Sequence, residues 1–174
     1  MKMYRLTAAV CSALMVGTAF VALPSVTQAA TDQTDLILNP DFENGKTVGW
    51  DIAGDRCVDI ATKAGDMQGK GALHFWKDKD FKFTASQVVE DVPDGTYTVT
   101  VMTQGGGGEK AMQLFAESNG QKKTADIKNT GWNKWQTWTV SGVEVKGGKL
   151  TIGVMVDGNA GNWGSFDNFT LTKE

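Results

Sequence analysis

The sequence predicts an all-β protein folded as a two-sheet antiparallel β-sandwich of the jelly-roll type. Between residues 36 and 171, short runs rich in Val, Thr, Ile, Phe and Trp are separated by Gly, Asp and Asn roughly every ten residues, as in proteins with many short strands. The run 96–103 alternates strictly, which predicts that Tyr97, Val99 and Val101 face the core. Apolar residues show no helical period. We therefore expect one sandwich domain over residues 36–174.

About ten strands are expected from these runs. They are placed at residues 36–38, 49–53, 57–61, 71–76, 81–89, 96–104, 111–117, 121–128, 135–145 and 149–172, the last broken by a loop at 158–164. Asp94-Gly95, Asn119-Gly120 and Gly147-Gly148 lie between such runs and predict hairpin turns, because these residue types tolerate a positive φ.

The N-terminus predicts a secretory signal peptide over residues 1–29. Lys2 and Arg5 precede an uncharged run from residue 6 to residue 23. Thr27 and Ala29 are the small residues at −3 and −1 that signal peptidase needs, so cleavage is expected after Ala29, with Ala30 as the alternative. A membrane anchor is the other interpretation, but the run falls short of the ~20 residues that a span needs. We expect a short polar segment at 30–35 after cleavage, and a protein that is secreted, either extracellular or associated with the cell surface.

Composition narrows the classes of partner. All 20 acidic residues follow the signal, whereas Arg56 is the only arginine that does, so a basic face for nucleic acid is not expected. Cys57 is the only cysteine beyond the signal and has no internal disulfide partner. We expect a monomer that does not insert into a membrane after cleavage of the signal.

Most catalytic chemistries lack their residues. His74 is the only histidine and no Gly-x-Ser-x-Gly turn is present, which argues against a serine hydrolase and against zinc catalysis. The glycine run 105–108 is followed by Glu109-Lys110 and not by the residues of a phosphate-binding loop. A glycosidase needs only two suitably spaced carboxylates, so that class stays open.

The six tryptophans are the most informative residues. Trp132, Trp135 and Trp138 repeat every third residue, which does not fit one face of a strand. We expect Trp138 to face inward, with a β-bulge at 141–142 keeping the valines after it inward, Trp135 to cap the sandwich and Trp132 to lie in the preceding loop.

Trp76 and Trp163 lie among polar and turn-forming residues. In the run 73–76, Leu73 and Phe75 are expected inward, which leaves His74 and Trp76 outward. An exposed indole beside polar loop residues suits carbohydrate, since a pyranose lays its apolar face on the ring while its hydroxyls seek polar partners. The alternative for Trp163 is a lid over the end of the sandwich.

Several segments together resemble family 61 carbohydrate-binding modules. They are residues 73–76 (LHFW), 83–87 (FTASQ), 94–98 (DGTYT), 104–109 (QGGGGE), 131–135 (GWNKW) and 159–164 (NAGNWG). The resemblance covers nearly all of the chain after the signal and implies a galactose-binding-domain-like sandwich that recognises β-1,4-galactan without cleaving it. Such modules usually accompany a galactanase. This chain is either a module from a longer protein or a secreted stand-alone binder, and the expected signal peptide favours the second.

A site and an ion follow from this resemblance. The carbohydrate-binding candidates are Trp76, Trp163, His74, Gln104, Glu109, Asn162, Trp132 and Asn159. Related sandwiches also share a structural Ca²⁺ between an N-terminal Phe-Glu and an Asp before the last strand, which here implies Glu43 and Asp167, with Asp41 as a third ligand. Two other functions are weighed against glycan binding: a small galactan-cleaving glycoside hydrolase and a surface sandwich that binds another protein.

Overall fold

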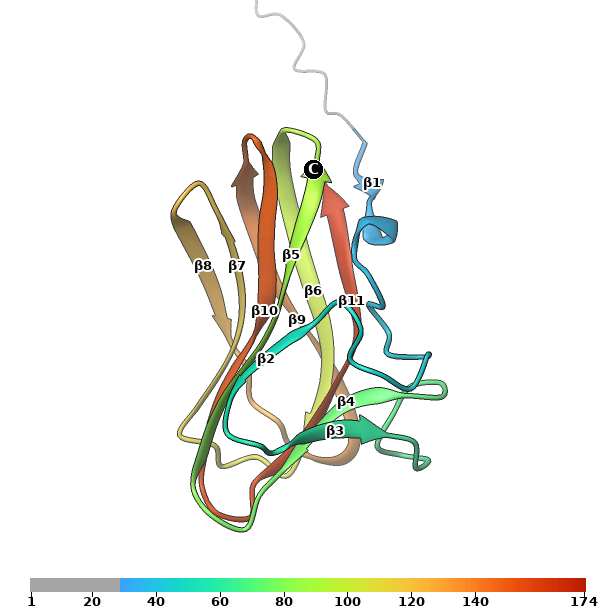
Figure 1. The fold of residues 1–174 in the computed structure, drawn as a ribbon, viewed down its shortest axis with the longest axis vertical. Coiled ribbons are helices and arrows are strands. Elements are labelled where there is room, and N and C mark those ends of the chain that lie inside the picture. The colour runs from blue at the N-terminus through green and yellow to red at the C-terminus, as the bar shows by residue number, and fades with distance from the viewer. Residues whose placement is uncertain (1–28) are drawn as a thin grey trace, which may run out of the picture.

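Alternation of apolar and polar side chains builds the two long sheets of this protein. The computed structural model describes residues 29–174, and in β5 (Phe81–Val92), for example, every second side chain up to Val89 is buried. The buried sides of the sheets face each other across one hydrophobic core (Figure 1). This confirms the predicted two-sheet antiparallel β-sandwich.

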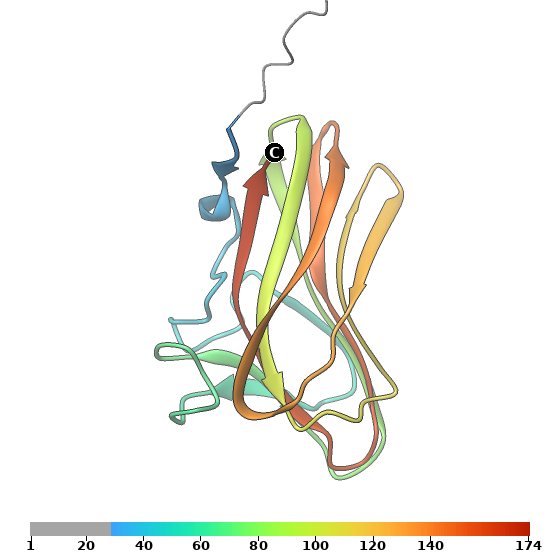
Figure 2. The ribbon, with the colours of Figure 1, turned by 180° about the vertical axis from the view of Figure 1, so that it is seen from behind.

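The strand order positions the ends of the sandwich. The other strands are β1 (Thr31–Asp32), β2 (Asp51–Gly54), β3 (Val58–Ala61), β4 (Ala72–Trp76), β6 (Gly95–Gly105), β7 (Ala111–Ser118), β8 (Gln121–Asp126), β9 (Gly131–Val145), β10 (Gly148–Gly158) and β11 (Trp163–Lys173). The six-stranded sheet has the order β3-β4-β11-β6-β9, with β1 added to β11, and the five-stranded sheet has the order β2-β5-β10-β7-β8. All the pairings are antiparallel. Figure 2 shows the six-stranded sheet from behind, and β3 and β4 lie across the lower part of the molecule.

Aromatic rings fill the core beneath β3 and β4. Phe75 of β4 stacks on Phe166 of β11 with ring centroids 5.6 Å apart and contacts Phe83 of β5 at 5.5 Å. Phe75 and Phe166 are fully buried, so each contributes about 1.5–3 kcal/mol of hydrophobic stabilisation. The sheet that carries the candidate site therefore rests on a rigid base.

The N-terminal part departs from the expected strands. The polar segment 30–35 contains β1, which pairs with β11, and the start of a short 3-10 helix, η1 (Thr34–Leu36). The expected strand at 36–38 was wrong. The amide side chain of Gln87 there accepts from the Leu38 N–H at 2.7 Å and donates to the Leu38 carbonyl at 2.8 Å, so it replaces a neighbouring strand.

The predicted irregularity at 141–142 is confirmed. Tyr97 pairs with Val143 and Val99 with Val140, so β9 uses one residue more than β6 between these pairs, and Gly142 has a φ of 66°. The bulge keeps Val140 and Val143 buried on the same face. Trp138 packs against the core, as expected.

The position of Trp132 differs from expectation. Strand β9 begins at Gly131, so Trp132 lies in this strand and not in the loop before it, and Trp135 follows in the same strand. The pairing of β6 with β9 shifts register between Thr103 and Gly105, so the first residues of β9 do not continue the regular ladder. That irregular start leaves Trp132 58% exposed, whereas Trp135 is half-buried.

Candidate carbohydrate-binding site

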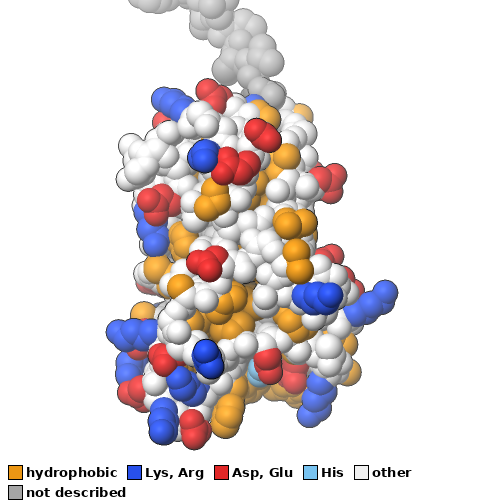
Figure 3. Space-filling model, viewed as in Figure 1, with side chains coloured by type: hydrophobic (Ala, Val, Ile, Leu, Met, Phe, Trp, Pro, Cys, Tyr) orange, Lys and Arg blue, Asp and Glu red, His pale blue; other side chains and the backbone are white. Residues whose placement is uncertain are grey.

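Aromatic side chains gather at the end of the six-stranded sheet that contains β3 and β4. An open groove of about 480 Å³ lies there. It is lined by Lys63, Asp66, His74, Trp76, Trp132 and Trp163. Figure 3 shows the pale-blue histidine side chain low on the face of Figure 1, between acidic and hydrophobic side chains. Four of the eight predicted carbohydrate-binding residues therefore lie together.

The register of β4 and β11 brings two indoles to one place. Trp76 and Trp163 are Cα partners, as are His74 and Ser165 two residues away. Paired residues of antiparallel strands project to the same face, and Leu73 and Phe75, which alternate with them, are fully buried. The predicted inward and outward alternation of residues 73–76 is confirmed, with Trp76 56% exposed.

Polar contacts hold the floor of the groove. His74 Nδ1 lies 3.1 Å from the Ser165 hydroxyl, and Gln104 Nε2 donates to the same hydroxyl at 3.5 Å. Gln104 Oε1 accepts the Asn133 N–H at 2.9 Å. Gln104 is fully buried, so this predicted binding residue supports His74 from beneath and joins the floor to the start of β9.

Trp132 reaches the groove from β9 and is fixed by the loop between β3 and β4. Its indole Nε1 donates to Asp66 Oδ1 at 3.0 Å. The ring lies against Gly65, where a side chain would collide with it: a Cβ there would lie 2.9 Å from Trp132 Cε2. Sequence reasoning missed Lys63 and Asp66, because nothing in the local sequence links this loop to a residue 66 positions later.

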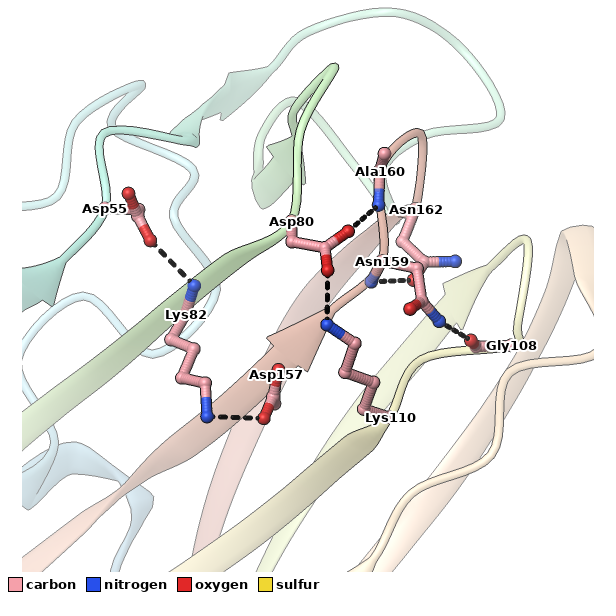
Figure 4. A network of polar contacts seen from close by, with 9 residues as sticks. All are labelled: Asp55, Asp80, Lys82, Gly108, Lys110, Asp157, Asn159, Ala160 and Asn162. Atoms are coloured by element: carbon pink, nitrogen blue, oxygen red, sulfur yellow. Dashed lines mark hydrogen bonds and ion pairs between the residues drawn. The ribbon is translucent and has the colours of Figure 1, made fainter.

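The loop before Trp163 is braced by hydrogen bonds, which Figure 4 shows. Asp80 Oδ1 accepts the Ala160 N–H at 2.9 Å, and Asp80 Oδ2 pairs with Lys110 Nζ. Asn162 Oδ1 accepts the Asn159 N–H at 2.6 Å. Further bonds tie this loop to the glycine run: Asn159 Nδ2 donates to the Gly108 carbonyl at 2.8 Å and Asn162 Nδ2 to the Gly107 carbonyl at 3.0 Å. The two asparagines thus hold the loop in shape.

The glycine run makes room for an indole. A Cβ on Gly106 would lie 2.7 Å from Trp163 Nε1, so only glycine lets that ring lie against the backbone. Gly107 and Gly108 have φ values of 78° and 84°, which side chains rarely adopt. The indole of Trp163 thus requires glycine at 106, and the positive φ values favour glycine at 107 and 108.

Glu109 lies elsewhere. It lines a separate small cavity with Lys110, Asp126 and Lys128, and its Oε1 is buried without a hydrogen-bond partner. Burial raises the pKa of its carboxyl. The structure does not bring this predicted binding residue to the groove.

Comparison with solved structures decides the family. This chain is 34% identical to the module TmCBM61, whose structure was solved in complex with β-1,4-galactotriose, with a TM-score of 0.73. The match covers 78% of this chain and 96% of that one. The chain belongs to family 61 of the carbohydrate-binding modules. The resemblance of its motifs to that family is thereby confirmed.

More distant structures share only the fold of this family 61 module. A family 16 carbohydrate-binding module is 18% identical with a TM-score of 0.58, over 78% of this chain and 98% of its own. A xylan-binding CBM22-1 domain from Paenibacillus barcinonensis Xyn10C is 19% identical with a TM-score of 0.54, over 75% and 89%. No protein-family model and no curated protein matches the chain.

The three carboxylates of the expected calcium site hold backbone segments. The carboxylate of Asp167 accepts from the N–H groups of Gln68 and Asn168, at 2.8 and 2.7 Å. Glu43 Oε1 accepts the Lys70 and Gly71 N–H groups, and Asp41 Oδ1 accepts the Glu43 N–H. Glu43 and Asp167 thus anchor the loop between β3 and β4, which carries Asp66 to the groove.

The carboxyl of Asp167 holds its proton more tightly than an ordinary aspartate does. It is fully buried, and desolvation, with smaller effects from the charges of Glu43 and Asp41, raises the pKa of its carboxyl to about 7 against the two hydrogen bonds that lower it. None of the five ion pairs within residues 29–174 includes these three acids. Carboxylate oxygens of this kind suit Ca²⁺. Among the described residues, however, no three acidic, histidine or cysteine side chains are grouped closely enough to hold a metal ion.

The described residues contain no helix long and apolar enough to cross a membrane. The expected signal peptide lies almost wholly outside residues 29–174, so the structure does not bear on it.

Proposed function

We propose that this protein is a secreted, non-catalytic carbohydrate-binding protein that binds β-1,4-galactan or related galactose-containing glycans. The observation that carries the proposal is the convergence of three indoles around His74 in an open groove, in a chain of family 61. Galactose has an apolar face that can lie on Trp76 or Trp163, while its hydroxyls meet His74, Asp66 and Lys63. The match to a module solved with β-1,4-galactotriose supports the choice of sugar.

Binding without cleavage fits the chemistry of the groove. Asp66 is the only carboxylate that lines it within the described residues, and that carboxylate already accepts the Trp132 indole N–H. Glycoside hydrolysis needs a pair of carboxylates across the scissile bond. A shallow, open site also suits weak binding, with dissociation constants of about micromolar to millimolar.

The deciding experiment is affinity electrophoresis of the mature protein in native gels that contain galactan, arabinan, xylan or galactomannan, with reducing ends assayed on the same polysaccharides. We expect retardation by galactan alone and no release of reducing ends. Release of reducing ends would instead support a galactan-cleaving hydrolase. Absence of retardation on every glycan, with self-association, would support a protein-binding sandwich.

We also propose that Ca²⁺ binds near Glu43, Asp41 and Asp167, where it would neutralise the buried charge of Asp167. The three carboxylates offer the oxygen ligands that Ca²⁺ prefers, which supports this proposal. Their side chains are not grouped closely enough to share an ion, so they would have to move together to bind it. Its test is the melting temperature of the protein in the presence of a chelator.

A further inference from the structure

A second groove adjoins the first one at Trp76. Its volume is about 660 Å³, and Trp76 and His74 line both grooves. Its other walls come from Arg56, Asp59, Lys77 and Asp78, among others. The two grooves therefore lie on either side of one exposed indole and share a floor.

Strand order explains this continuity. In the six-stranded sheet β3 lies at the edge, β4 next to it and β11 beyond. Asp59 of β3 is the Cα partner of His74, just as Ser165 of β11 is its partner on the other side. Cross-strand partners project to the same face, so Ser165, His74 and Asp59 form one row across three strands. The row of Trp163 and Trp76 lies two residues along from this one, so Asp59 is a diagonal neighbour of Trp76 on β3. A chain molecule that crosses Trp163 and Trp76 toward β3 therefore passes beside Asp59.

The polar groups of the second groove are free to bind. None of the five ion pairs within residues 29–174 includes Arg56, Asp59 or Asp78. Lys77, in contrast, is already paired with Asp55 at 2.7 Å. The free charges are thus one guanidinium and two carboxylates.

This charge pattern selects among sugars. A hydroxyl both donates and accepts, so the hydroxyls of a neutral sugar can donate to Asp59 or Asp78 and accept from Arg56. A uronate would add a negative charge where carboxylates already outnumber unpaired cations, which is unfavourable. The groove is therefore better suited to neutral sugar residues than to acidic ones.

We propose that the binding site extends past Trp76 and that Arg56, Asp59 and Asp78 bind further neutral residues of the same glycan chain. This inference rests on the proposed galactan binding and specifies the length of the binding site. The protein binds more consecutive sugar residues than the tryptophan groove alone can hold. Affinity should therefore depend on chain length, and that dependence should reside in Arg56 and Asp59.

The test is isothermal titration calorimetry with β-1,4-galactotriose and β-1,4-galactohexaose. The wild-type protein should bind the hexaose about tenfold more tightly, as expected for one or two added hydrogen bonds to charged groups. Asp59→Ala and Arg56→Ala should lose most of this gain and keep the triose affinity within about twofold. Asp51→Ala is the matched control, because Asp51 is an exposed carboxylate on β2 of the opposite sheet.

The outcomes are distinct. Equal affinity for triose and hexaose in the wild type, or equal losses for both ligands in Asp59→Ala, would overturn the extended site while leaving galactan binding intact. No binding of either ligand would overturn both proposals. A second probe is hexagalacturonate, which is long enough to reach the second groove, measured at low ionic strength in the wild type and in Asp59→Ala. Tighter binding by the variant, which has lost one carboxylate, supports the selection for neutral sugars, and binding no tighter than that of the wild type would overturn it.

Discussion

Trp76 and Trp163 are Cα partners on the adjacent antiparallel strands β4 and β11, so both indoles stand on the same face of the six-stranded sheet. Neither strand alone would create the groove. Hydrogen bonding between the strands fixes their mutual position, and the buried Phe75 and Phe166 beneath fix the strands. Binding and stability should therefore be separable by substitution.

Trp76→Ala should reduce galactan affinity about tenfold or more, because it removes a stacking surface. The indole is 56% exposed, so the free energy of unfolding should change by no more than about 0.5 kcal/mol. Affinity electrophoresis and thermal melting measure the two effects. Trp50→Ala is the matched control: Trp50 is buried against Phe42 and Phe169, and its loss should cost about 3–5 kcal/mol of stability. A large loss of stability in Trp76→Ala would instead assign that indole to the core.

Gly106→Ala should weaken binding by displacing Trp163. The new methyl would lie 2.7 Å from the indole Nε1, so the ring must move. In a double-mutant cycle, adding Gly106→Ala to Trp163→Ala should produce no further loss of affinity, since the effect passes through the ring. Additive losses would show that Gly106 contributes by another route, such as direct contact between sugar and backbone.

The sequence predicted most of the fold because strand pattern is local information. The alternation in β5 and β6, the glycine turns and the bulge at 141–142 all depend on residues close together in the chain. The strand expected at 36–38 failed because Gln87, distant in sequence, satisfies the backbone of Leu38 with its side chain.

Only part of the site was predicted from the sequence. The residues predicted correctly depend on local strand alternation, whereas the others depend on contacts with distant residues. Alternation on β4 indicated the outward position of Trp76 and His74. Whether a polar residue is open to a ligand depends on distant partners: Gln104 is engaged by Asn133 and Ser165, and Asn162 by the glycine loop. Asp66 reaches the groove only through the path of a long loop, which no short pattern encodes.

Asp80→Ala should weaken galactan binding by freeing the loop that precedes Trp163. The Asp80 carboxylate holds the Ala160 N–H and pairs with Lys110, and these contacts lower the pKa of the carboxyl. Because this pKa lies below that of the unfolded chain, the contacts persist at neutral pH and should be lost as the pH falls below about 4. Calorimetry with galactotriose should show a loss in Asp80→Ala that Asp80→Asn partly restores. Matching affinities in the alanine variant and the wild type would remove the loop brace from the account of binding.

EDTA should lower the melting temperature, and more so at pH 8 than at pH 5. Burial raises the pKa of Asp167 to about 7, above the unfolded value of 3.8. Between these two values the folded protein retains a proton that the unfolded chain has lost, so in the metal-free protein the stability contributed by Asp167 falls as the pH rises from about 4 to about 7. A bound Ca²⁺ would stabilise the ionised carboxylate and offset that loss, because an ion held only by the native state adds to its stability. Asp167→Asn is the informative variant, since it should abolish both the calcium dependence and this part of the pH dependence. Suppose instead that chelator leaves the melting temperature unchanged at both pH values, while the stability of the wild type still falls as the pH rises from about 4 to about 7. That result would mean that Asp167 titrates as a buried acid without a bound metal ion.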